Sequence, residues 1–104
     1  MAQTKTTTKG DTRQKTKRQK PHLWKVVLLN DDFTSFEFVV CILTTLFHKS
    51  MDEAHNLTLQ IHHQGKGVGG IYTYEVAETK RTEVLRLAKQ EHFPLQCKLV
   101  REND

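Results

Sequence analysis

Three polar residues, Asn30, Asp31 and Asp32, stand directly after the apolar run 26–29 and directly before a helix-start signal. Asn and Asp often serve only to form turns, because their side-chain oxygens bond to nearby backbone N–H groups. A capped turn uses one or two such acceptors, so three consecutive polar residues leave at least one carboxylate or amide available. The sequence therefore predicts a corner that can face a cation or an ammonium group.

A histidine further along the chain, His62, can reach the same corner. It follows Thr58 by four residues, which places it beside the apolar face of a predicted helix and near the end of that helix. If this helix packs beside the one that follows Asn30, the two helices enclose a short groove. We expect Asn30, Asp31 and His62 at its polar mouth. The candidate walls of the groove are Val39, Thr58, Ile61 and Leu95.

The hydrophobic pattern predicts the elements that must position these residues. Their order is a strand over 23–29, a helix over about 35–48, a helix from 50 to the Gly65 stop signal, a strand over 67–73, a helix over 74–91 and a strand over 95–100. The order β-α-α-β-α-β with only three strands indicates an α+β fold. We expect a small three-stranded antiparallel sheet packed against three helices.

Two capping-box spacings support the helix starts. In the first, at 34–37, the hydroxyl of Thr34 is expected to cap the helix and Glu37 to reach back. In the second, Ser50 and Glu53 have the same spacing. The sequence therefore predicts that the polar corner ends directly at a capped helix.

Charge is unevenly distributed along the chain. Residues 1–20 carry seven Lys or Arg and one Asp, for a net charge of +6, whereas the rest of the chain carries nine basic and eleven acidic residues. Residues 1–20 also lack any large apolar residue except Met1, so they cannot bury enough surface to offset the entropy of ordering. We expect a disordered basic extension over 1–20 and one core domain over 21–104.

A basic extension can bind nucleic acid through phosphates. This one has no interleaved aromatic residues, and we expect no cationic face on the core to join it. A nucleic-acid accessory protein therefore stays open only as an alternative.

The remaining composition bears on the compartment. No run approaches a membrane span, and the N-terminal residues lack the apolar segment and cleavage site of a signal peptide. Cys41 and Cys97 are far apart and lie in apolar patterns, so we expect two buried thiols. These features indicate a cytoplasmic protein.

From Trp24 to Leu99 the chain resembles the ClpS adaptors, bacterial proteins that feed N-degron substrates to a Clp ATPase and its protease. The resembling blocks, in the family's order and spacing, are 25–34, 37–39, 62–67, 75–80 and 94–95. Five ordered blocks in one small domain are a specific signal, whereas a lone Asn-Asp-Asp would carry none. The resemblance implies the same α+β fold and an adaptor that is not an enzyme and has no cofactor or metal.

The resemblance also implies roles for single residues. Asn30, Asp31 and His62 match the family residues that hold the free α-amino group of a substrate, while an adjoining pocket takes a bulky first side chain such as Phe, Tyr, Trp or Leu. The matching pocket residues are Phe36, Val39, Thr58, Ile61 and Leu95, with Asp32 and Thr34 at the rim. Glu75 and Lys80 match a segment that docks on the N-terminal domain of a ClpA-type ATPase.

Two positions depart from the usual family pattern. Phe36 and Thr58 stand where methionine is common. Methionine adapts its shape, whereas Phe is stiff and Thr is smaller. We expect an altered preference among Phe, Tyr, Trp and Leu termini, with the direction left open.

Enzyme chemistry is the other alternative. Asp31 and His62 could act as a base and its partner in a small hydrolase, but no nucleophile, cofactor loop or metal set accompanies them. His55 could form a metal pair with Asp31 or Asp32, yet no HExxH or paired CxxC motif is present.

Overall fold

The six elements follow one another in the predicted β-α-α-β-α-β order in the computed structural model, which describes residues 21–102. They are β3 (Leu23–Leu29), α1 (Phe36–Thr45), α2 (Met51–Gln64), β4 (Lys66–Thr73), α3 (Tyr74–Gln90) and β5 (Gln96–Arg101). The extension predicted over 1–20 and the last two residues of the predicted core domain lie outside the described residues.

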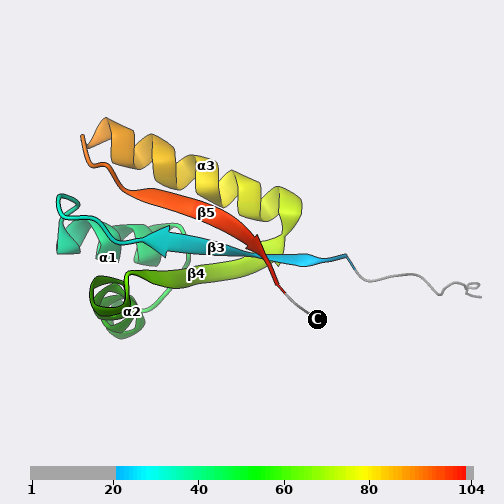
Figure 1. Cartoon of the computed structure of the whole chain (residues 1–104), viewed down its shortest axis with the longest axis horizontal. Helices are drawn as coiled ribbons and strands as arrows, with labels where there is room; N and C mark the ends of the chain where they lie inside the picture. Colours follow the sequence, from blue (N-terminus) through cyan, green and yellow to red (C-terminus); the bar gives the residue numbers. More distant parts are fainter. Residues whose placement is uncertain (1–20, 103–104) are drawn as a thin grey trace, which may run out of the picture.

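The three strands form one sheet in the order β4-β3-β5. Strand β3 is in the middle and pairs antiparallel with both neighbours, as the sequence predicted. Figure 1 shows α3 running alongside β5, and α2 packs against α1 and β4. The α+β prediction is confirmed.

Alternating side chains of the strands face the helices and form the core. Val26 and Leu28 of β3 are fully buried, and Ile42 and Leu43 of α1 are at most 1% exposed. Burying one such side chain contributes roughly 1.5–3 kcal/mol to folding. The buried cluster as a whole is Val26, Leu28, Val39, Ile42, Leu43, Phe47, Ala54, Ile61, Ala77, Val84, Ala88, Leu95 and Cys97.

The other face of the sheet carries three lysines. Lys25, Lys66 and Lys98 line one depression together with Val27 and Val100. The expectation that the core offers no cationic face was therefore wrong, because the lysines come from three different strands and only the pairing of those strands brings them together. The face carries no aromatic side chain among its lining residues, so it lacks the stacking platforms typical of single-stranded nucleic-acid binding.

The first helix starts and ends differently from the prediction. Its cap is Ser35, whose hydroxyl accepts the backbone N–H of Phe38 at 3.1 Å, because the Thr34 hydroxyl is bonded to Asp31 instead. The helix ends at Thr45, three residues before the predicted end. The Thr45 hydroxyl donates to the Cys41 carbonyl at 2.7 Å, and His48 has a left-handed φ of 57°.

The second helix starts as predicted. The Ser50 hydroxyl accepts the Glu53 N–H at 3.1 Å, and the Glu53 carboxylate accepts the Ser50 N–H at 3.0 Å. This reciprocal box satisfies donors at the helix start that would otherwise lack partners. These bonds also hold the pKa of Glu53 below its ordinary value.

The two cysteines differ in exposure. Both are free thiols, and Cys97 is buried whereas Cys41 is exposed. The prediction of two buried thiols was therefore wrong for Cys41, which lies on the outer side of the short helix α1. Burial raises the pKa of Cys97 to about 11.

No helix within residues 21–102 is long and apolar enough to span a membrane.

Candidate functional site

The site is built where the end of β3 meets the end of α2. The backbone N–H of Asn30, directly after β3, donates to the carbonyl of Gly65 at 2.9 Å. Gly65 is the C-cap of α2 and lies three residues after His62. This bond therefore brings the polar corner and the histidine, remote in sequence, to one place.

Glycine suits the backbone conformation at the end of α2. Gly65 has φ 91° and its N–H donates to the Ile61 carbonyl at 2.8 Å. This left-handed conformation costs an ordinary L residue about 1–2 kcal/mol, whereas glycine adopts it freely. The turn then leads directly into β4, which pairs with β3.

A second glycine lets α2 approach the sheet closely. A Cβ added at Gly67 would lie 2.7 Å from Cγ1 of Ile61 and 3.0 Å from Cδ1 of Leu57. The absence of a side chain at Gly67 thus fixes how near Ile61 and the adjoining His62 lie to the strands.

The Asp31 carboxylate organises the polar corner. Its Oδ1 accepts the backbone N–H groups of Phe33 at 2.8 Å and Thr34 at 2.7 Å, and its Oδ2 accepts the Thr34 hydroxyl at 2.7 Å. Partial burial acts to raise the pKa of Asp31, but the hydrogen bonds from Thr34 and Phe33 outweigh it and the pKa lies below the ordinary value. Asp31 is therefore a charged carboxylate with three of its roughly four acceptor positions occupied.

The neighbouring carboxylate is much less engaged. Asp32 is exposed and accepts no hydrogen bond from any residue between 21 and 102. Its acceptor positions are thus open to a ligand.

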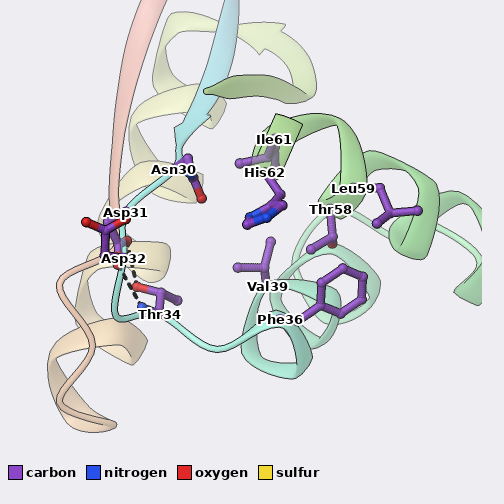
Figure 2. A pocket seen from close by; sticks show the side chains of 10 residues that line it. All are labelled: Asn30, Asp31, Asp32, Thr34, Phe36, Val39, Thr58, Leu59, Ile61 and His62. Atoms are coloured by element: carbon purple, nitrogen blue, oxygen red, sulfur yellow. Dashed lines mark hydrogen bonds between the residues drawn. The ribbon is translucent and has the colours of Figure 1, made fainter. Parts of the chain in front are cut away.

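These residues surround a pocket of about 310 Å³. Figure 2 shows Asn30, Asp31, Asp32 and Thr34 on one side, with the other side chains opposite or at the back. The lining residues are Asn30, Asp31, Asp32, Thr34, Phe36, Val39, Thr58, Leu59, Ile61 and His62. The structure thus brings together the predicted amine-binding residues, both predicted rim residues and four of the five predicted wall residues.

The fifth predicted wall residue, Leu95, is not among the residues that line this pocket. It is only 2% exposed, belongs to the core cluster and faces a depression beside Ala88 and Phe93 at the end of α3. A residue was also missed, since Leu59 lines the pocket and is 37% exposed. Its spacing of three from His62 places both on one face of α2 and could have indicated it.

The two departures from the family pattern both lie at the pocket. Thr58 is 4% exposed and its hydroxyl donates to the Ala54 carbonyl at 2.7 Å, so its proton is used within the helix. Phe36 is half-buried, and its ring meets His55 edge to face with centroids 5.0 Å apart. The pocket wall is therefore apolar and partly aromatic.

The residues predicted to dock an ATPase lie at the start of α3. Glu75 is exposed in the first turn, whereas Lys80 is half-buried. The Lys80 ammonium donates to the Leu46 carbonyl at 2.6 Å and lies 5.7 Å from the centre of the Tyr72 ring. Lys80 thus connects α3 to the residue that caps the end of α1.

Within residues 21–102, no group of three or more His, Cys, Asp or Glu side chains is arranged to hold a metal ion. His55 contacts Phe36 rather than a carboxylate.

Comparison with known proteins identifies a family. The family model of the ATP-dependent Clp protease adaptor protein ClpS matches residues 19–98. The ClpS protein of Parvibaculum lavamentivorans is 53% identical over 88% of this chain and 83% of its own length, and that of Rhodospirillum centenum is 49% identical over 85% and 82%.

A solved structure is similar to this chain in both fold and sequence. The structure of Agrobacterium tumefaciens ClpS2 bound to L-phenylalaninamide has a TM-score of 0.77 and 37% identity, and the match covers 80% of this chain and all of that chain. The chain belongs to the ClpS family of adaptor proteins of the ATP-dependent Clp protease.

Proposed function

We propose that the pocket between Asn30 and His62 binds the free α-amino group and the first side chain of N-degron proteins, which this adaptor then delivers to the Clp protease. One observation carries the proposal: acceptors and an apolar cavity of about 310 Å³ stand side by side. Phenylalaninamide, the ligand of the similar Agrobacterium protein, joins an ammonium group to an apolar ring.

The number of protons on the ligand explains selectivity for chain termini. An ammonium group has three N–H donors, and it can leave water only if acceptors replace the hydration it loses. The Asn30 amide oxygen, a carboxylate and an unprotonated His62 nitrogen supply three. An internal peptide amide has one proton and no charge, so it cannot satisfy this set.

The structure supports a division of labour between the two carboxylates. The sequence assigned the amine contact to Asp31, yet three donors of the chain already bond to that carboxylate. We propose that Asp31 mainly positions the corner, while Asp32 supplies the open carboxylate. Both still contribute negative charge beside the ammonium group.

Magnitudes are adequate for adaptor binding. Charge-assisted hydrogen bonds contribute roughly 1.5–3 kcal/mol each, and burial of a Leu or Phe side chain adds roughly 1.5–3 kcal/mol. After the entropic cost of association is subtracted, we expect a binding free energy of about −8 kcal/mol, which corresponds to a dissociation constant near the micromolar range.

Calorimetric titration of a Phe-starting peptide and of its N-acetylated twin tests the proposal. Acetylation removes the charge and two of the three protons, so the binding heat should disappear. Equal affinity of the two peptides would overturn amine recognition. An Asn30→Ala variant that retained full binding would argue against amine capture. It would favour the alternative in which Asp31 and His62 act as a base and its partner in a small hydrolase.

Two single substitutions separate the carboxylates. Asp32→Asn should weaken binding of phenylalaninamide by about tenfold or more, since it removes the free charge, without changing thermal stability. Asp31→Asn should lower stability, because its amide nitrogen cannot accept the Thr34 hydroxyl. If only Asp31→Asn weakened binding in protein that remained folded, the direct contact would belong to Asp31.

The face at the start of α3 is the proposed contact for the N-terminal domain of a ClpA-type ATPase. Glu75, Val76 and Lys80 line a depression there, and Val76 is 44% exposed. An exposed apolar residue between two charges suits a partner surface. We also propose that the protein acts in the cytoplasm.

The basic residues 1–20 are proposed to assist transfer rather than capture. A chain truncated before residue 21 should therefore bind Phe-starting peptides as the full chain does. Loss of binding on truncation would contradict this assignment.

A further inference from the structure

A row of outward-facing side chains leads away from the pocket along α2. Met51, His55 and Leu59 recur every four residues, so they lie on one face of the helix. All three are exposed, Met51 by 66% and Leu59 by 37%. We call these three residues the α2 row. Leu59 also lines the pocket, so the row begins at its mouth.

A residue of α1 widens this surface. The Phe36 ring, which lines the pocket, meets the His55 ring edge to face at 5.0 Å, with an angle of 63° between the planes. The pocket rim and the α2 row therefore form a continuous surface of aromatic and apolar groups. An exposed apolar surface joined to a binding site is a place where the ligand can extend.

The layout of the pocket fixes the direction in which a bound chain leaves it. Figure 2 shows Asn30, Asp31 and Asp32 on one side of the pocket and Phe36 and Leu59 on the opposite side. If the ammonium group of the first residue lies at the polar side and its side chain points into the pocket, its carbonyl must point away from the polar side. The backbone of the second residue of the ligand then lies next to Phe36 and Leu59.

We propose that the α2 row is a second subsite, which binds apolar side chains at the third and fifth residues of an N-degron polypeptide. In an extended chain alternate side chains share a side and are about 6.6 Å apart, while successive members of the row are about 6 Å apart along the helix. The first residue occupies the pocket, so the third and fifth face the row and the second and fourth face solvent. This inference rests on the proposed function of the pocket.

Three synthetic peptides and phenylalaninamide test the subsite on the full chain by calorimetry. The peptides are Phe-Ala-Leu-Ala-Leu-Ala, Phe-Ala-Ser-Ala-Ser-Ala and the register control Phe-Leu-Ala-Leu-Ala-Ala. The first should bind about fivefold tighter than the second, an advantage that partial burial of two leucines can supply. The register control should gain no more than about twofold over the serine peptide, because its leucines face solvent.

A matched pair of variants assigns the effect to the row. Met51→Ser should reduce the leucine advantage while leaving the affinity for phenylalaninamide unchanged, since Met51 does not line the pocket. Ile71→Ser removes another exposed apolar side chain, 44% exposed, from β4 and should change neither value. Thermal melts check that both variants are folded.

The outcomes separate the two proposals. If phenylalaninamide does not bind to the wild-type chain, the proposed function fails. If it binds but the leucine advantage is absent, is matched by the register control, or survives Met51→Ser unchanged, the second subsite is refuted and the pocket proposal stands.

Discussion

The backbone N–H of Asn30 donates to the carbonyl of Gly65 at 2.9 Å, and this single bond joins the two halves of the site. It continues the β3–β4 ladder by one step beyond the Leu29–Lys66 pair. Since Gly65 also ends α2, the position of His62 depends on the same turn. The strand pairing and the site geometry are therefore coupled.

This coupling makes position 65 sensitive to the type of residue rather than to its size. Nothing lies within 4 Å of a Cβ added there, so any effect comes from the backbone conformation at φ 91°. Gly65→Val should lower stability by about 1–2 kcal/mol or more and also weaken phenylalaninamide binding. Gly65→Asn is the matched control, because Asn tolerates the left-handed conformation, and it should retain most of both.

Denaturant melts and calorimetric titration on the two variants provide the measurements. Equal stability of the Val and Asn variants would show that the left-handed turn does not limit the fold.

The low pKa of Asp31 gives a pH-dependent stability of predictable sign. The carboxyl has an ordinary value of 3.8 and a lower value in the fold. Its contribution is therefore complete above the ordinary value and is lost as the pH falls through the lower, folded value. Asp31→Asn should be less stable than wild type near neutral pH, and this difference should shrink in strong acid.

Thermal unfolding followed by circular dichroism across the acid range measures the difference. Asp32→Asn is the control for removal of a carboxylate charge, since Asp32 accepts no hydrogen bond from the described part of the chain, and its thermal stability near neutral pH should match that of wild type. A constant deficit for Asp31→Asn across the range would contradict the assigned hydrogen bonds.

Thr58 limits the volume of the pocket from one wall. It is buried in the wall and has a much smaller side chain than methionine. Thr58→Met should fill part of the cavity and weaken binding of a Trp-starting peptide by about tenfold, or about 1.4 kcal/mol, while Leu-starting peptides lose less. Thr58→Val is the control, because it keeps the volume and loses only the bond to Ala54.

Fluorescence titration of peptides that differ only at the first residue gives the ranking. If Thr58→Met weakened all four bulky termini equally, the wall at position 58 would not decide the preference.

Local features of the sequence predicted the fold well. The branched run of β3 gave its bounds correctly, and the Ser50–Glu53 spacing identified a cap that the structure confirms. Errors arose where one polar residue had two possible partners. Thr34 could cap α1 or bond to Asp31, and the structure has the second bond, so Ser35 becomes the cap.

The site was less predictable where it depends on long-range packing. The family resemblance and helical spacing grouped Asn30, His62 and most of the wall, because these lie next to identifiable element ends. Leu95 is not among the lining residues, and its burial beside Ala88 and Phe93 depends on how the end of α3 meets β5. The three lysines of the open sheet face were missed for the same reason, since only strand pairing unites them.

Docking to the ATPase should respond to Glu75 and Lys80 in different ways. Glu75 is exposed and within residues 21–102 makes no salt bridge, so Glu75→Arg should preserve the fold and phenylalaninamide binding. It should weaken binding to the N-terminal domain of a ClpA-type ATPase by about tenfold or more if charge complementarity operates there.

Lys80→Met should weaken docking too, and because it also removes the bond to the Leu46 carbonyl, it should lower the stability of the fold by about 1 kcal/mol. Surface plasmon resonance with the isolated ATPase domain measures the docking, and melting curves separate the loss of stability from the loss of contact. If Glu75→Arg bound the domain as wild type does, the start of α3 would not be the docking face.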